Sequence, residues 1–213
     1  MKRICTVLIL LCMLVGCSAR EQIKLPREYS DLSFIPQSRQ KVFTEGKYYM
    51  DTLNQSTGYL AMQYYGLATD ERGMYITTDN NIDAPGLYLV TETSAEDIKQ
   101  HLDTLFTPAL SSKLWSLYFT EYNGMGAIID RSVGHGFQDS VSVYTVHRMD
   151  TDAIEYTEKR YYFYQGANES DRDYAARKTE LANPVVTETY DVALQRSMMQ
   201  WKTDSYEWGV YNE

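Results

Sequence analysis

The sequence predicts an α+β fold in which helices pack on a curved antiparallel sheet. Two amphipathic helices follow one another in the middle of the chain, between Ser94 and Thr120. Segments with strand-like alternation then occupy the second half, after a turn at Asn123-Gly124. Helices that precede a series of antiparallel strands are typical of α+β domains, because each layer needs the other to cover its apolar face.

The first element in chain order is a signal segment, expected at residues 1–16. Lys2 and Arg3 precede a run from Ile4 to Val15 that is apolar except for Thr6. This run is well short of the roughly 20 residues that cross a bilayer core. It is therefore typical of a cleaved secretion signal rather than of a membrane-spanning helix.

The end of this segment, Leu14-Val15-Gly16-Cys17, resembles the lipobox of bacterial lipoproteins. In those proteins the cysteine thiol is diacylglycerylated and the chain is cut just before it. Two acyl chains anchor a protein stably where one does not. We therefore expect Cys17 to carry the lipid, such as palmitate, that holds the protein on the extracytoplasmic face of the cell membrane. The alternative is an ordinary signal peptide with a chance cysteine.

The mature chain from Cys17 holds 197 residues, enough for a domain with a sizeable core. Lys2 and Arg3 leave with the signal, so 18 basic residues face 29 acidic ones and the net charge is −11. This balance argues against a nucleic-acid partner and favours a basic partner or a neutral ligand. Cys5 and Cys12 also leave, which excludes a disulfide within the mature chain and a zinc site built from thiolates.

We expect a lipidated tether at residues 17–33 and a single α+β domain at residues 34–213. The tether prediction rests on the many charged residues, with Pro26 and few apolar residues, in this stretch. Within the domain, residues 70–92 are expected to form a small hairpin lobe.

The first part of the domain mixes helix and strand signals. Apolar residues at helical spacing predict a helix from Ser38 to Ser56. The apolar patch from Leu60 to Leu67 is ambiguous between helix and strand. Two β-type runs, Met74 to Thr78 and Gly86 to Thr91, are joined by a loop rich in turn residues and predict the hairpin of the lobe.

The helix signals are clearest in the middle of the chain. Thr93, with Glu96 three residues later, forms a capping box and predicts a helix that begins near Ser94. Thr107-Pro108 ends this helix and begins the next one, because proline suits the first helical position. Asn123-Gly124 then supplies the positive φ angles of a tight turn.

Five strands are expected after this turn. Alternation is cleanest from Ser140 to His147, which predicts one buried face and one partly wetted face. The charged segment from Gly166 to Pro184 breaks the series and is either a mobile loop or the site of a short helix near Tyr174 to Leu181. Trp201 is expected to be buried against the helix that bears Leu114 and Trp115. The predicted strands are Gly126–Arg131, Asp139–Met149, Ile154–Tyr164, Val185–Gln195 and Gln200–Trp208.

No catalytic, cofactor or metal constellation stands out in the sequence. The histidines, His101, His135 and His147, lie on different elements without metal-binding spacing, and we expect His101 to face solvent. The sequence also lacks a nucleophile elbow, a mature thiol and a phosphate-binding glycine loop. We therefore expect a binding protein with no catalytic residues, no cofactor and no metal.

Acidic residues supply the candidate binding surface. Glu169, Asp171 and Asp173 form a cluster in the charged segment between two predicted strands, a position where loops commonly carry function. We predict that this cluster contacts a basic patch on a cell-wall hydrolase or another envelope protein. Other carboxylate pairs, Glu155 with Glu158 and Glu188 with Asp191, are expected to be solvated strand residues.

A pattern of helices, turn and strand extends over roughly residues 70–208. It consists of helix Ala95–Phe106, the junction Phe106-Thr107-Pro108, helix Ala109–Thr120, the Asn123-Gly124 turn and the strand segment Trp201–Ser205. This pattern resembles the secreted DL-endopeptidase inhibitor family of Gram-positive bacteria and is similar to lipoproteins with folds like nuclear transport factor 2. The resemblance implies a non-catalytic domain at the cell surface, and in the inhibitor family an acidic surface that blocks the groove of a peptidoglycan-cleaving peptidase.

Three functions stay open at this stage. The first is inhibition of a peptidoglycan DL-endopeptidase, and the second is binding of a small ligand in a pocket walled by tyrosines, Trp115 and Trp201. A structural or adhesive surface protein, the third, needs no pocket. An apolar cavity lined by several aromatic side chains would favour the ligand binder, whereas a filled interior beside an exposed acidic loop would favour a protein-binding function.

Overall fold

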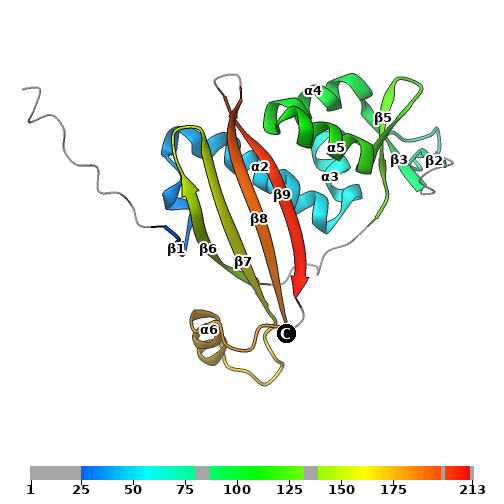
Figure 1. Cartoon of the computed structure of the whole chain (residues 1–213). Helices are drawn as coiled ribbons and strands as arrows, with labels where there is room; N and C mark the ends of the chain where they lie inside the picture. Colours follow the sequence, from blue (N-terminus) through cyan, green and yellow to red (C-terminus); the bar gives the residue numbers. More distant parts are fainter. Residues whose placement is uncertain (1–24, 80–86, 132–138, 198–199, 212–213) are drawn as a thin grey trace, which may run out of the picture.

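The computed structural model describes residues 25–79, 87–131, 139–197 and 200–211, which form two antiparallel sheets with associated helices (Figure 1). The predicted α+β class is confirmed. The signal segment, Cys17 with its lipobox, and His135 lie outside the described residues. Among the helices within the described ranges, none is both long and apolar enough to cross a membrane.

The larger sheet has the strand order β1-β6-β7-β8-β9. Strands β6 to β9 form consecutive antiparallel hairpins, which lie side by side in Figure 1. The predicted alternation on β6 is confirmed, because Tyr144 and Val146 are buried while their neighbours are partly exposed. The strands span Arg27–Tyr29 (β1), Asp139–Met149 (β6), Ala153–Phe163 (β7), Val186–Ser197 (β8) and Gln200–Tyr211 (β9).

Part of the expected tether at residues 17–33 belongs to the folded domain instead. Strand β1 pairs with β6, with Tyr29 opposite Tyr144. The short 3-10 turn η1 (Leu32–Phe34) follows, and the Phe34 ring is buried in the core. A strand of three residues is too short to show alternation, so the sequence pattern could not reveal it.

The smaller sheet has the strand order β2-β3-β5-β4 and corrects the prediction of an outlying hairpin at residues 70–92. β2 pairs with β3 as expected, but β3 also pairs with β5, so the hairpin is half of a four-stranded sheet. Asn123 and Gly124 have φ angles of 51° and 82°, which confirms the tight turn, here between β4 and β5. The strands span Thr77–Asp79 (β2), Leu87–Ser94 (β3), Phe119–Tyr122 (β4) and Met125–Ile129 (β5).

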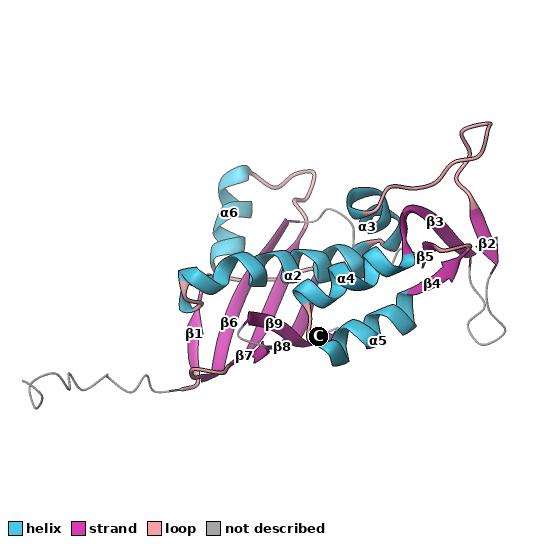
Figure 2. Ribbon diagram, turned by 90° about the horizontal axis from the view of Figure 1, so that it is seen from above, coloured by secondary structure: helices cyan, strands magenta, loops and turns pink. Residues whose placement is uncertain are grey.

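Helix α2 lies along one face of the larger sheet, and α3, α4 and α5 lie between this sheet and the smaller one (Figure 2). The ambiguous patch after residue 60 is helical and forms part of α3. The cap of α4 is Ser94, whose hydroxyl accepts the backbone N–H of Asp97, and not the predicted Thr93. The helices span Gln37–Gln55 (α2), Thr57–Tyr64 (α3), Ala95–Leu105 (α4), Pro108–Tyr118 (α5) and Asp171–Thr179 (α6).

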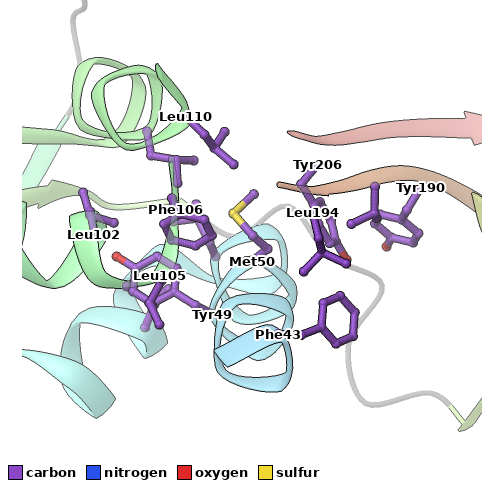
Figure 3. Packing of buried hydrophobic residues seen from close by; sticks show 14 of the residues in the cluster. Phe43, Tyr49, Met50, Leu102, Leu105, Phe106, Leu110, Tyr190, Leu194 and Tyr206 are labelled. Carbon is purple, nitrogen blue, oxygen red and sulfur yellow. The ribbon is translucent and has the colours of Figure 1, made fainter. Parts of the chain in front are cut away.

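Apolar side chains from the helices and the larger sheet share one continuous core (Figure 3). Phe106, at the junction of α4 and α5, is fully buried and its ring centroid lies 5.6 Å from that of Tyr49 on α2. Its backbone forms a parallel bridge with Thr203 on β9. Gly46 lets α2 approach the same strand closely, since an added Cβ would lie 3.0 Å from the Thr203 hydroxyl oxygen.

The sequence predicted that His101 faces solvent. The structure instead places it half-buried among tyrosine rings. Its Nδ1 lies 3.1 Å from the Tyr65 hydroxyl, which also lies 2.8 Å from the hydroxyl of Tyr49. Burial lowers the pKa of His101 below its ordinary value of 6.5, and the carboxylate of Glu45 opposes this effect only in part. The neutral imidazole is therefore the form that suits the folded protein.

Stability should fall as the solution is acidified from pH 7.5 to pH 5.5. Because the pKa of His101 is lower in the folded than in the unfolded chain, its contribution is complete above about pH 6.5 and is lost as the pH falls toward the folded value. Thermal unfolding at both pH values should show a drop in Tm that is clearly smaller in His101→Gln. An identical drop in the variant would assign the pH dependence to other groups.

Trp201 is half-buried on β9 and packs against α2, which corrects the expectation of burial against α5. The Arg39 guanidinium lies 3.9 Å from the centroid of the Trp201 ring. Replacing Trp201 with alanine should therefore lower the free energy of unfolding by about 2 kcal/mol, less than loss of a fully buried tryptophan. Urea unfolding of Trp201→Ala, Arg39→Ala and the double variant measures this, and strictly additive losses would contradict the Arg39 contact.

Candidate functional site

Four charged side chains between α2 and β7 form a closed ring in which positive and negative charges alternate. Lys47 Nζ lies 2.9 Å from Asp51 Oδ2 and 2.9 Å from Glu158 Oε2. Arg160 Nη2 lies 3.0 Å from Asp51 Oδ1 and 3.0 Å from Glu158 Oε1. Each carboxylate thus contacts both cations, and each cation contacts both carboxylates.

Local geometry explains how two segments far apart in sequence supply this ring. Lys47 and Asp51 are four residues apart on α2, so they share one face of the helix. Glu158 and Arg160 are two residues apart on β7, so both point to the same face of the sheet, which is the face that α2 covers. Their exposed fractions are only 1% and 5%. Buried charges of this kind are tolerated when they are paired and hydrogen-bonded.

Hydroxyl groups from three strands surround the ring. Ser142 on β6 donates a 2.7 Å hydrogen bond to Glu158, and Tyr206 on β9 donates a 2.6 Å hydrogen bond to Asp51. Tyr190 on β8 packs its ring 4.6 Å from the Arg160 guanidinium. The Tyr190 hydroxyl also donates to Glu188, a further buried carboxylate on β8. The ring is therefore fixed from every neighbouring strand.

The neighbouring charges also set the protonation states of Asp51 and Arg160. Burial alone would raise the pKa of Asp51, but the Lys47 ammonium and the Arg160 guanidinium bring that pKa below its ordinary value. Burial likewise would lower the pKa of Arg160, but Asp51 and Glu158 raise it above its ordinary value. A general acid near neutral pH needs a raised carboxyl pKa. Asp51 is ionised there, so it is unsuited to that role.

The ring forms the floor of an open pocket of about 420 Å³, within the usual range for small-ligand sites. Tyr48 on α2 and Tyr59 on α3 stand at its rim, with exposed fractions of 47% and 48%. Gln63 donates a 2.9 Å hydrogen bond to the Tyr48 hydroxyl and so holds this ring in place. The remaining lining residues are Thr52, Gln55, Ser140, Ser142 and Tyr144.

The acidic cluster predicted from the sequence lies elsewhere, at the start of α6, where a helix replaces the alternative of a mobile loop. Glu169 forms a 2.8 Å ion pair with Arg177, and Asp173 accepts a hydrogen bond from Ser170, the N-cap of α6. Asp171 accepts a hydrogen bond from Gln165. These acids therefore stabilise their own segment, and a role in partner binding stays a prediction.

The structure also shows which site residues the sequence analysis misjudged. Glu158 and Glu188 were expected to be solvated, yet both are buried. The sequence does contain a pattern that indicates burial of Glu158, because this residue shares its face of β7 with Tyr156 and Tyr162. The carboxylate at this position was taken as a sign of exposure, although the alternation placed it on the apolar face.

Trp115 and Trp201 do not wall the cavity that the sequence predicted. Trp115 stacks on Phe119, with ring centroids 5.6 Å apart, and Trp201 packs against Arg39. The space between α2 and the larger sheet is filled by core side chains (Figure 3). Within the described ranges, no group of three or more histidine, cysteine or acidic side chains is placed to hold a metal ion.

Comparison with known proteins finds no matching family, and no curated protein matches the sequence either. The resemblance to DL-endopeptidase inhibitors and to lipoproteins like nuclear transport factor 2 therefore stays a prediction.

Proposed function

We propose that this protein is a membrane-anchored extracytoplasmic lipoprotein that binds a small polar ligand, without catalysis, in the pocket above the charged ring. The observation that carries the proposal is the location of the ring at the floor of an open pocket. Here the Asp51 side chain keeps 22% of its surface exposed, toward a pocket edged by tyrosines.

The arrangement fits binding better than chemistry. Glu158 is held by Lys47, Arg160 and Ser142, so it is not available as a nucleophile. Asp51 is ionised near neutral pH, as argued above. A fixed array of donors and acceptors without a free acid or nucleophile is suited to recognising polar groups.

The proposal is tested with the chain that starts at Ser18, which keeps every described element. A panel of neutral, cationic, anionic and zwitterionic small molecules is screened by ligand-observed NMR, and hits are measured by calorimetry. We expect at least one class to bind, and to bind more weakly to Tyr48→Ala than to Tyr75→Ala, a control whose side chain is 53% exposed and does not line the pocket. Absence of any binder, or equal binding by both variants, would contradict the proposal.

The anchor is tested separately. Cys17→Ala should leave the precursor uncut and should abolish incorporation of labelled palmitate, because the thiol is the expected acylation site. Labelling cells that express each form, followed by membrane fractionation, measures both effects. Palmitate incorporation into the variant would show that the lipobox hypothesis is wrong.

Inhibition of a peptidoglycan DL-endopeptidase is a second candidate function. Two observations favour it: the interior between α2 and the larger sheet is filled, as expected for a protein binder, and the α6 segment projects beyond the end of the larger sheet (Figure 1). Titration of purified cell-wall hydrolases at 0.05 M and 0.5 M salt tests it, since charge-led association weakens as salt rises. Inhibition that is unchanged when Glu169, Asp171 and Asp173 are replaced by amides would exclude this surface.

A further inference from the structure

We infer that the pocket above the charged ring recognises a neutral saccharide. This inference rests on the proposed function and specifies its ligand class. Three features of the pocket support it: the charge balance of the floor, the hydrogen-bonding groups that remain available, and the two tyrosines at the rim. The smaller sheet and the α6 segment are not involved.

The charge balance of the floor disfavours an ionic ligand. The ring contains two cations, Lys47 and Arg160, and two carboxylates, Asp51 and Glu158, so its formal charges sum to zero. An ionic ligand would find no excess charge of the opposite sign in this ring, so it would lose hydration without gaining an ion pair of its own, which is costly. A hydroxyl group can instead bind between a cation and a carboxylate without displacing either, because it both donates and accepts.

The ring also leaves suitable groups free for hydroxyls, as judged from contacts between described residues. Lys47 donates one hydrogen bond to Asp51 and forms an ion pair with Glu158, and an ammonium has three N–H groups, so at least one donor remains. Asp51 accepts three hydrogen bonds, from Lys47, Arg160 and Tyr206, and a carboxylate has about four acceptor positions. Ser142 donates to Glu158 and keeps its own lone pairs. A ligand with adjacent hydroxyls matches this mixture of donors and acceptors.

The rim supplies the apolar contact that a sugar ring needs. The C–H faces of a saccharide are apolar while its edge carries hydroxyls, and an aromatic ring packs well against such a face. Tyr48 and Tyr59 line the pocket, and each residue is about half exposed to solvent. Gln63 restrains Tyr48, so the Tyr48 side chain loses less conformational freedom when a ligand packs on it. Stacking on the tyrosines would direct the hydroxyl edge of the sugar toward the charged ring at the floor of the pocket.

The experiment compares matched ligands that differ in charge. Glucose, N-acetylglucosamine and cellobiose are the neutral probes, glucosamine and glucuronate are the charged sugars, and spermidine and alanyl-alanine are the charged compounds without a sugar ring. Binding to the chain that starts at Ser18 is measured by saturation-transfer NMR and calorimetry at 0.15 M salt. We expect at least one neutral sugar to bind more tightly than both charged sugars, with saturation transfer strongest at the C–H protons of one ring face.

The tyrosine variants test the stacking contact independently. Tyr48→Ala and Tyr59→Ala should each weaken binding of the neutral sugar about three- to tenfold, while Tyr75→Ala leaves it unchanged. Both tyrosines are exposed, so each variant should keep the fold, and thermal unfolding of each variant checks this. Preference for a charged probe that is sensitive to Tyr48→Ala would overturn the saccharide inference but keep the pocket as the binding site. If no probe binds, the inference fails, and the wider screen described above decides whether the proposed function fails with it.

Discussion

Replacing Arg160 with methionine is expected to lower the free energy of unfolding by about 3–5 kcal/mol, the usual cost of removing one partner from a buried ion pair. The guanidinium contacts Asp51 and Glu158 and packs on Tyr190, and its side chain is only 6% exposed. Methionine has a similar length and fills most of the space, so the loss reports mainly the missing charge. Urea denaturation followed by circular dichroism measures the change.

Arg148→Met provides the matched control. Arg148 also pairs with two carboxylates, Asp150 and Glu155, but its side chain is 52% exposed. Exposed ion pairs are screened by solvent and contribute little, so this variant should unfold close to the wild type. Equal losses for the two arginines would show that the ring charges are not desolvated and would remove the physical basis of the binding site.

Replacing Phe106 with alanine is expected to cost about 3–5 kcal/mol as well, for a different reason. The ring is fully buried between α2 and α4 (Figure 3), and the residue joins the helices beside the smaller sheet to β9 of the larger one. The substitution leaves a cavity at the place where the two sheets are coupled. Thermal and urea unfolding should both show the loss, and the two sheets should then unfold less cooperatively.

Leu117→Ala is the control for this substitution. Leu117 lies on the neighbouring helix α5 and is 52% exposed, so little apolar area is lost when its side chain is shortened. We expect a change within about 0.5 kcal/mol, as is usual for surface positions. A Phe106→Ala variant that is as stable as Leu117→Ala would mean that the junction does not couple the two sheets.

Local patterns in the sequence were sufficient to predict the long helices and strands. The paired helices between Ser94 and Thr120, the turn at Asn123 and the long strands from Asp139 onward all carry periodicity that depends on adjacent residues. The short strands β1 and β4 were missed, because three or four residues do not establish a period. β4 was assigned to the end of the preceding helix, and only its pairing with β5 reveals it as a strand.

The candidate site depended on contacts between distant segments. Arg160 and Asp51 are 109 positions apart, and nothing near either residue indicates that they meet. His101 illustrates the same limit, since its place on α4 suggested a solvated residue and the tyrosines of α2 and α3 enclose it. Whether a charged or polar side chain is buried depends on what packs over it, which local sequence does not state.

By itself the sequence determined the α+β class, the order of the long elements, the acidic balance of the chain and the expectation of a lipid anchor at Cys17. Only the tertiary structure decided that there are two sheets and that Glu158 and Arg160 lie beneath α2, facing Lys47 and Asp51. The physical reason is desolvation. A carboxylate on a strand is favourable in water and also in the interior if cations meet it there, and the packing of α2 on the sheet supplies those cations.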